Sequence, residues 1–200
     1  MGALWTSGDD GHNPEYAHLL ALARAGRVPT PTPAPAPLGS ARLEPLGPWV
    51  ASAEADATGR RGEVIGPPPG LSVNDASLVL RLSFAGRAVL FPGDLEADGE
   101  GELVGRAALG QAVAADVLKV PHHGSRTSSS GELIAAVHPA LAVISLGWRN
   151  RFHFPAPVVL ARYAAAGAAV LRTDRDGAVT VTIAPDGRVT AVHERREAPR

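Results

Sequence analysis

The chain has 200 residues, of which 45% are hydrophobic, and its 19 basic and 20 acidic residues leave a formal net charge of −1. This size and composition predict one soluble globular domain, while the balanced charge argues neither for nor against nucleic-acid binding. The absence of cysteine excludes disulfides, thiolate zinc sites and cysteine nucleophiles, so histidine and carboxylate side chains must hold any transition metal. No apolar run approaches the roughly 18 to 20 residues that cross a bilayer, so we expect no membrane insertion by this chain.

The first part of the chain is expected to contain one helix and one short strand. Apolar residues recur with helical spacing over residues 14–24, and Gly26 ends the pattern. Alternating prolines in residues 29–37 remove backbone donors, which predicts an extended connection at the surface. A strand is expected over 41–46, within a stretch from 29 to 70 that otherwise has the composition of a loop.

From residue 74 onward, short apolar runs alternate with helical patterns. The first two runs flank a turn at Phe84 to Arg87 and predict a β-hairpin. Interleaved strands and helices predict an α/β or α+β fold with a mixed sheet, in a single domain over 1–193 that ends in a charged tail at 194–200. The expected strands are 77–82, 88–91, 116–120, 140–146, 168–172, 178–183 and 188–192, and the expected helices are 95–107, 130–137 and 157–166.

A carboxylate follows the second strand of the expected hairpin. Asp94 comes directly after Pro92 and Gly93, and the glycine allows a sharp backbone turn at the strand end. An aspartate in this position is well placed to bind a hard or borderline cation. The alternative is that Asp94 caps the following helix, since aspartate is common at helix starts.

Two adjacent histidines, His122 and His123, follow the next strand. Because neighbouring residues of an extended segment point to opposite sides, we expect only one imidazole to share a metal with Asp94. The other imidazole would donate a hydrogen bond to a metal ligand or contact a phosphate. The alternative is a polar loop with two solvated histidines. Lys119, on the preceding strand, is either an edge residue whose ammonium reaches solvent or a charge directed at the same pocket.

Further polar residues lie between the strand 140–146 and the next helix. The run Asn150-Arg151-Phe152-His153 combines a hydrogen-bond donor, a cation and a third histidine. Arg151, as a planar fork, could orient a phosphate or carboxylate, although the start of the following helix explains the same residues equally well. Asn74 precedes the hairpin, where a turn is the better prediction from the residues alone.

In chain order, these motifs resemble the metallo-β-lactamase-fold domain of the ComEC competence family. The resemblance extends from about Gly2 to Ile183, and it implies that Asp94 matches the aspartate that commonly bridges two divalent cations in this fold. His122 and His123 match the paired histidines of the site and, with Asp94, are the implied metal ligands; Lys119 joins them as a catalytic residue. The implied substrate-binding residues are Asn74, Ser125, Asn150, Arg151 and His153. The matching motifs are Asn74-Asp75-x-Ser77, Phe91-Pro92-Gly93-Asp94, the runs from Asp116 to Ser125 and from Asn150 to Pro155, and Arg172 to Gly177.

The resemblance also implies an activity and partners. In such sites two divalent cations, zinc or manganese, activate a water for attack on a phosphoester. ComEC-like proteins are bacterial inner-membrane channels for DNA uptake in transformation, and the hydrolase domain would degrade the strand that is not imported. The implied partners are therefore DNA and the membrane-channel portion of a parent protein.

The sequence departs from the family pattern because the ligand motif His-x-His-x-Asp-His is absent. One aspartate and one or two histidines cannot fill the coordination of two cations, which take about four to six donors each. We therefore expect an N-terminally truncated domain, the C-terminal part of an αββα sandwich, with weak or absent metal binding and impaired hydrolysis. Two alternatives are a non-catalytic binding module that keeps the fold, and a hydrolase of the same fold acting on a phosphocholine ester or a lactone.

Overall fold

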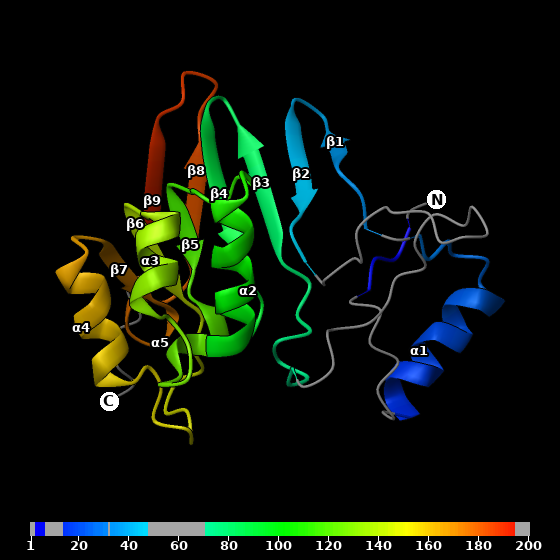
Figure 1. Ribbon diagram of the computed structural model, residues 1–200, viewed down its shortest axis with the longest axis horizontal. Coiled ribbons are helices and arrows are strands. Elements are labelled where there is room, and N and C mark those ends of the chain that lie inside the picture. Colours follow the sequence, from blue (N-terminus) through cyan, green and yellow to red (C-terminus); the bar gives the residue numbers. More distant parts are fainter. Residues whose placement is uncertain (1–2, 7–13, 32, 48–70, 195–200) are drawn as a thin grey trace.

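The computed structural model describes residues 3–6, 14–31, 33–47 and 71–194, which form a seven-stranded sheet, a two-stranded sheet and several helices (Figure 1). The seven strands lie in chain order, with antiparallel pairing from β1 to β4 and parallel pairing from β4 to β7. The predicted α/β class with a mixed sheet is thus confirmed. The strands are β1 (Ala36–Leu38), β2 (Ala41–Pro45), β3 (Leu80–Phe84), β4 (Arg87–Phe91), β5 (Val117–Lys119), β6 (Leu141–Ile144) and β7 (Ala169–Arg172).

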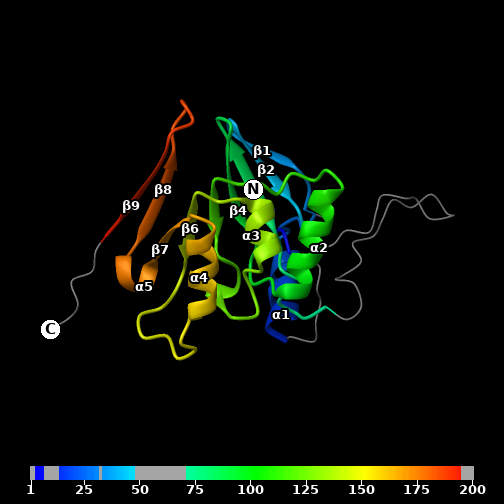
Figure 2. The same ribbon diagram turned by 60° about the vertical axis from the view of Figure 1, so that its left-hand side comes forward.

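The parallel half of the sheet carries its helices on one face. Helix α2 (Ala97–Ala108) connects β4 to β5, α3 (Gly131–Val137) connects β5 to β6, and α4 (Pro157–Ala165) connects β6 to β7. Each connection steps one strand in the same direction, and such crossovers are right-handed, so all three helices pack on the same side. Figures 1 and 2 show the three helices grouped there. The main core between them and the sheet includes Leu90, Leu103, Leu118, Leu133, Ile144, Val159 and Tyr163.

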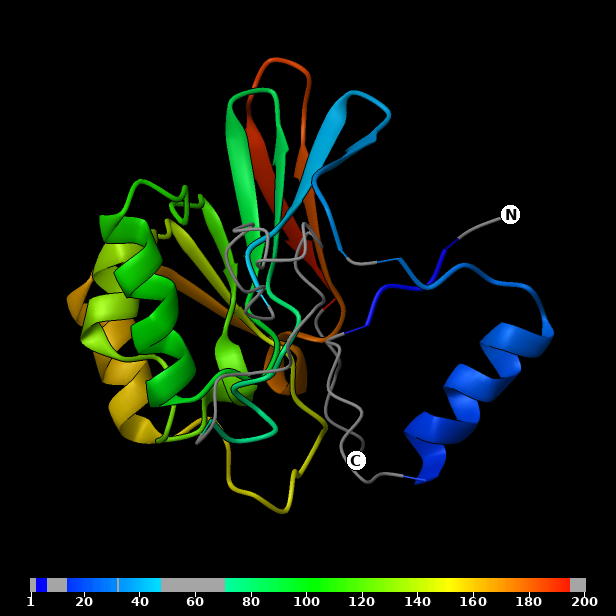
Figure 3. The same cartoon turned by 45° about the vertical axis from the view of Figure 1, so that its right-hand side comes forward.

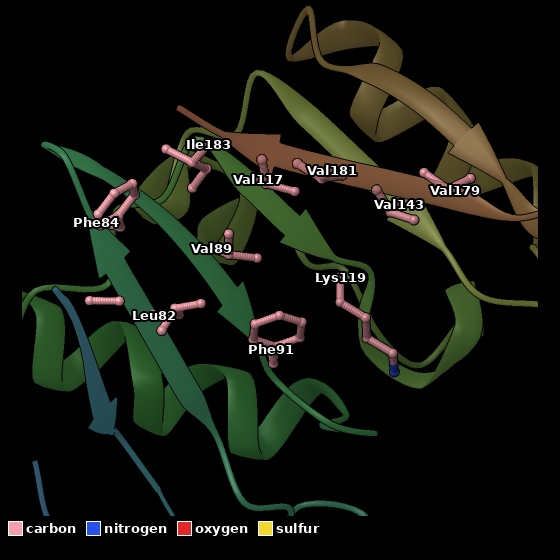
Figure 4. Close-up of a pocket in the computed structure, with 11 residues that line it drawn as sticks. Leu82, Phe84, Val89, Phe91, Val117, Lys119, Val143, Val179, Val181 and Ile183 are labelled. Carbon is pink, nitrogen blue, oxygen red and sulfur yellow. The ribbon is translucent and has the colours of Figure 1, made fainter. Parts of the chain in front are cut away.

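A β-hairpin lies against the opposite face of the sheet. Strands β8 (Val179–Ile183) and β9 (Val189–His193) pair antiparallel in a sheet of their own. At the hairpin tip, Arg87 Nε donates a hydrogen bond of 2.9 Å to the Gly187 carbonyl, which ties the hairpin to the β3–β4 turn. Side chains of β8 and of the large sheet line an apolar pocket of about 500 Å³ between the two layers (Figure 4). Its walls include Leu82, Val89, Phe91, Val117, Val143, Val179, Val181 and Ile183.

Two local features differ from the expected elements, and the expected hairpin turn is confirmed. Strand β1 lies at the end of the proline-rich stretch and pairs with β2; Pro37 is tolerated because β1 is an edge strand. The β3–β4 turn contains only Ala85 and Gly86, whose positive φ angles of 49° and 75° are typical of a two-residue hairpin. The short helix α5 (Thr173–Asp176) was not predicted; the Arg172 amide donates to Asp176 Oδ2 at 2.7 Å beside it.

Helix α1 (Pro14–Ala25) confirms the first predicted helix and stands apart from the sheet, in blue in Figure 3. Ala23 is its buried residue, whereas Leu19 and Leu22 are exposed. Among the described helices, α1 included, none is long and apolar enough to cross a membrane. Residues 48–70 of the loop predicted within 29–70, and residues 195–200 of the tail predicted over 194–200, lie outside the described residues.

A buried carboxylate joins the three helices of the main layer. Glu100 of α2 has no exposed surface, and it accepts hydrogen bonds from the backbone amides of Ser129 (2.5 Å) and Ser130 (2.7 Å) at the start of α3. Tyr163 of α4 donates to Ser129 Oγ at 3.1 Å. Burial raises the pKa of Glu100 above its ordinary value of 4.5, and the amide donors oppose part of that rise. The network anchors the segment 125–130, which follows the paired histidines.

Replacement of Glu100 by alanine should lower the free energy of unfolding by about 2–4 kcal/mol, because two buried backbone amides lose their acceptor. Urea denaturation of the whole chain measures this change. Glu102→Ala, on an exposed position of the same helix, is the matched control and should stay within about 0.5 kcal/mol of the wild type. Equal effects of the two substitutions would show that the Glu100 network does not hold the helices together.

Candidate functional site

Three loops at the carboxyl ends of parallel strands meet at one edge of the large sheet. Asp94 follows β4, His122 and His123 follow β5, and Ser145 follows β6. Ligand sites of parallel sheets form beyond these strand ends, which is where the chain places its predicted metal ligands. These residues line an open pocket of about 370 Å³, together with Leu146, Gly147, Asn150, Phe152 and Phe154.

Asp94 is positioned by its backbone and faces a lysine. Its amide donates to Ser77 Oγ at 2.9 Å, and Gly93 at φ 66° permits the turn, since a Cβ there would lie 2.5 Å from the Ser77 Cβ. Lys119 Nζ donates to the Gly93 carbonyl at 2.8 Å and lies 3.3 Å from Asp94 Oδ1. The Lys119 stem lies along the apolar pocket of Figure 4 while its ammonium reaches the carboxylate. Asp94 does not cap the helix, because the N-cap of α2 is Glu96.

The paired histidines lie on a tight turn. Residues Pro121–Gly124 form the 3₁₀ helix η1, in which His122 and His123 have φ angles of 44° and 54°. The extended backbone assumed for this pair is replaced by the turn, and both side chains line the pocket. The expectation that only one imidazole shares a metal with Asp94 stays a prediction. Gly124, at φ 80°, packs directly on the next loop, since a Cβ there would lie 2.6 Å from the Pro155 Cβ.

His123 presents one nitrogen to Asp94. Its Nδ1 lies 2.7 Å from the carbonyl oxygen of Ser145, which can only accept, so Nδ1 carries the proton of this hydrogen bond. In the neutral ring, Nε2 is then left with a lone pair, and it lies 3.6 Å from Asp94 Oδ1. Two electron-rich atoms therefore face each other across a short gap that suits a positive charge.

His122 lies beside a second carboxylate. Its Nδ1 is buried 3.3 Å from Glu96 Oε1, yet it forms no hydrogen bond within the described part of the chain. Its ring and the Phe154 ring form a T-shaped pair, with centroids 5.8 Å apart and an interplanar angle of 71°. Glu96 Oε1 accepts a hydrogen bond of 2.8 Å from Thr127 Oγ1, which lies 2.9 Å from Ser125 Oγ. The predicted residue Ser125 is thus buried behind Glu96 and is not part of the pocket wall.

The remaining predicted residues divide between the pocket and its surroundings. Asn150 lines the pocket, and its side-chain amide closes the loop by exchanging two hydrogen bonds of 2.9 Å with the backbone of Phe154. Arg151 and His153 are exposed on the same loop and do not line the pocket. Asn74 lies in the turn before β3 and is also absent from the pocket wall.

The turn before β3 contributes a residue that the sequence reasoning missed. Asp75 is buried, and its Oδ1 accepts from the backbone amides of Glu96 (2.8 Å) and Gly99 (2.9 Å). Ser72 Oγ donates to Asp75 Oδ2 at 2.7 Å and accepts from the Asp75 amide at 3.1 Å. Asp75 therefore holds the start of α2 in place beside the pocket. The spacing Ser72-x-x-Asp75, which resembles a capping box, was the available signal.

The pocket supplies few donors for a metal ion. A catalytic zinc site usually has three protein ligands, and calcium or magnesium sites take more oxygen atoms. Asp94 Oδ1 and His123 Nε2 face one point, whereas His122 lies against Glu96. Within the described ranges, no three histidine, aspartate or glutamate side chains are grouped closely enough to hold a metal. These residues alone do not fit a complete metal centre.

Comparison with known proteins relates about half of the chain to competence proteins. It is 44% identical to competence protein ComA of Neisseria gonorrhoeae over 106 residues, which are 53% of this chain and 15% of that protein. It is 40% identical over 112 residues (56% and 14%) to ComE operon protein 3 of Bacillus subtilis, and 38% identical over 113 residues (56% and 14%) to recombination protein 2 of Haemophilus influenzae. The chain therefore spans about one seventh of the length of these relatives. No protein-family model matches it.

Asp75→Ala should lower the free energy of unfolding by about 2–3 kcal/mol, because the amides of Glu96 and Gly99 lose a charged acceptor. Chemical denaturation measures the loss, and amide hydrogen exchange should show the first turn of α2 opening more readily. Asp98→Ala, at an exposed position of that turn, serves as the control and should change stability by less than about 0.5 kcal/mol. A similar loss in both variants would mean that Asp75 acts only through the charge near the helix start.

Proposed function

We propose that this chain forms one wall of a DNA-hydrolysing site in a competence protein, on a metallo-β-lactamase-like fold. Two packed sheets with helices on one outer face support the fold, and the similarity to competence proteins supports the biological role. The activity would depend on zinc or manganese, with Asp94 and His123 as two of the ligands and the others supplied from outside the described residues. DNA and the membrane-spanning part of a longer competence protein are the proposed partners.

The arrangement of His123 is the observation that carries this proposal. Metal-binding histidines commonly donate their other ring N–H to a carbonyl or carboxylate, which fixes the ring and the tautomer. His123 has this arrangement with the Ser145 carbonyl, and its Nε2 faces Asp94. His123 is therefore the proposed ligand of the pair, while His122, beside Glu96, supports the pocket wall.

The chain's own residues would also bind the phosphodiester. Lys119 brings a positive charge within 3.3 Å of Asp94 Oδ1, where it balances the carboxylate and would attract a phosphate. Arg151 and His153 are exposed on the loop beside the pocket, where they would contact the DNA backbone. Asn150 would act by holding that loop in shape through Phe154.

A second candidate function is a non-catalytic DNA-binding module that keeps the same fold. The contact between Lys119 and Asp94 favours it, because a lysine ammonium 3.3 Å from the carboxylate already supplies the positive charge that a metal would bring. The two candidates differ in whether Asp94 and His123 bind a divalent cation.

Manganese titration of the whole chain, followed by NMR of the histidine ring protons, tests the proposal. We expect weak binding that broadens the His123 signals before those of the distant His18, because the ion lies between His123 and Asp94. Asp94→Asn should weaken this binding by about tenfold or more, since it removes a charged ligand.

The control for the manganese titration is Asp98→Asn, which removes one surface carboxylate outside the pocket and should leave the His123 broadening unchanged. Equal broadening of His18 and His123, or broadening of His123 that persists in Asp94→Asn, would contradict metal binding at this site. That result would favour the non-catalytic binding module.

A further inference from the structure

The loop between β6 and α4 exposes two large aromatic rings next to the pocket. Trp148 and Phe152 have 56% and 62% of their surface exposed. Large aromatic side chains dominate the energetics of cores and interfaces, so two of them exposed within five residues indicate a surface that binds something. Residues 148–152 are called the aromatic–arginine loop below.

Each exposed ring has an arginine beside it. The guanidinium carbon of Arg149 lies 5.8 Å from the Trp148 ring centroid, and that of Arg151 lies 5.0 Å from the Phe152 centroid. Both arginines are exposed. Two positive charges are thus concentrated on five residues of a chain whose formal net charge is −1. Flat apolar faces and adjacent cations together fit a ligand that offers both flat rings and negative charges.

Contacts within the loop keep this surface in place. The Asn150 amide group bonds to both backbone groups of Phe154. The Phe152 ring is stacked on the Phe154 ring, with centroids 5.7 Å apart and an interplanar angle of 21°. Phe154 in turn contacts His122. Because the Phe152 ring is held before a ligand arrives, binding there loses less conformational freedom than it would on an unstructured loop.

The position of the loop links it to the pocket. Phe152 lines the same pocket as Asp94 and His123, and Trp148 lies four residues before it on the same loop. A chain molecule stacked on Phe152 would therefore lead directly to the carboxylate and the imidazole.

We propose that the aromatic–arginine loop binds single-stranded DNA, with bases stacked on Trp148 and Phe152 and phosphates paired with Arg149 and Arg151. This inference rests on the proposed function for the choice of DNA, and it specifies the strand state. Base faces are free to stack on protein rings only when the bases are unpaired and splayed, whereas a duplex hides them between neighbouring base pairs.

Fluorescence anisotropy of a labelled ten-nucleotide thymidine strand, with the whole chain in EDTA, tests the proposal without any metal. Trp148→Ala and Phe152→Ala should each weaken binding by roughly five- to a hundredfold, the range measured for base–aromatic stacking. Arg149→Gln and Arg151→Gln should each reduce the slope of log K against log salt by about 0.7, since each removes one phosphate contact. The control variants are Leu109→Ala, which is 89% exposed at the end of α2, and Arg188→Gln near the β8–β9 turn; both should bind like the wild type.

Comparison probes decide whether the bases themselves are bound. An abasic strand of the same length keeps every phosphate but loses both stacking contacts, so it should bind the wild type at least as weakly as the thymidine strand binds Trp148→Ala. Equal affinity for the abasic strand, tighter binding of a duplex or of a uridine RNA strand, or aromatic variants that bind like the wild type would each overturn the proposal.

The results of the thymidine-binding experiment and of the manganese titration test the two proposals independently. Thymidine binding that depends on Trp148, together with no manganese binding at Asp94, would retain the single-strand site and reject the hydrolase. Manganese binding at Asp94 with no effect of the aromatic variants would retain the metal site and reject the proposed role of the aromatic–arginine loop.

Discussion

The parallel pairing of β4 with β5 and of β5 with β6 sets the position of the candidate site, because it brings three carboxyl strand ends to one edge of the sheet. Helices cover one face of these strands, since successive right-handed crossovers step in the same direction. The polar residues that the core cannot accept are therefore displaced to the loops beyond the strand ends. Asp94, the paired histidines and the aromatic–arginine loop occupy three neighbouring loops of this kind.

Electrostatic balance at this edge explains the arrangement of its side chains. Lys119 and His123 both face Asp94, and the hydrogen bond from His123 to Ser145 fixes which nitrogen points to the carboxylate. Behind this group, Asp75 and Glu100 accept hydrogen bonds from backbone amides at the starts of α2 and α3. The buried carboxylates keep the loops in place, while the half-exposed Asp94 remains accessible to a ligand.

Much of this organisation can be predicted from the sequence, because strands, helices and strand ends follow from the periodicity of apolar residues. Asp94 and both histidines were placed at the correct edge on that basis. The left-handed conformations of His122 and His123 could not be predicted, since residues other than glycine rarely adopt a positive φ and no local pattern marks one here. The role of Asp75 could not be predicted for a similar reason: Asn74 and Asp75 are both turn residues, and only the tertiary contact with α2 distinguishes them.

Chemical-shift mapping of the whole chain with a short thymidine strand tests most directly whether the loops at these strand ends form one DNA-binding surface. A DNA site at the strand ends predicts that the perturbed amides cluster in residues 145–154 and around His122 and His123. The β8–β9 hairpin and the far end of α2 should show no change. Perturbations concentrated on the hairpin or spread evenly over the surface would contradict a DNA-binding site at this edge of the sheet.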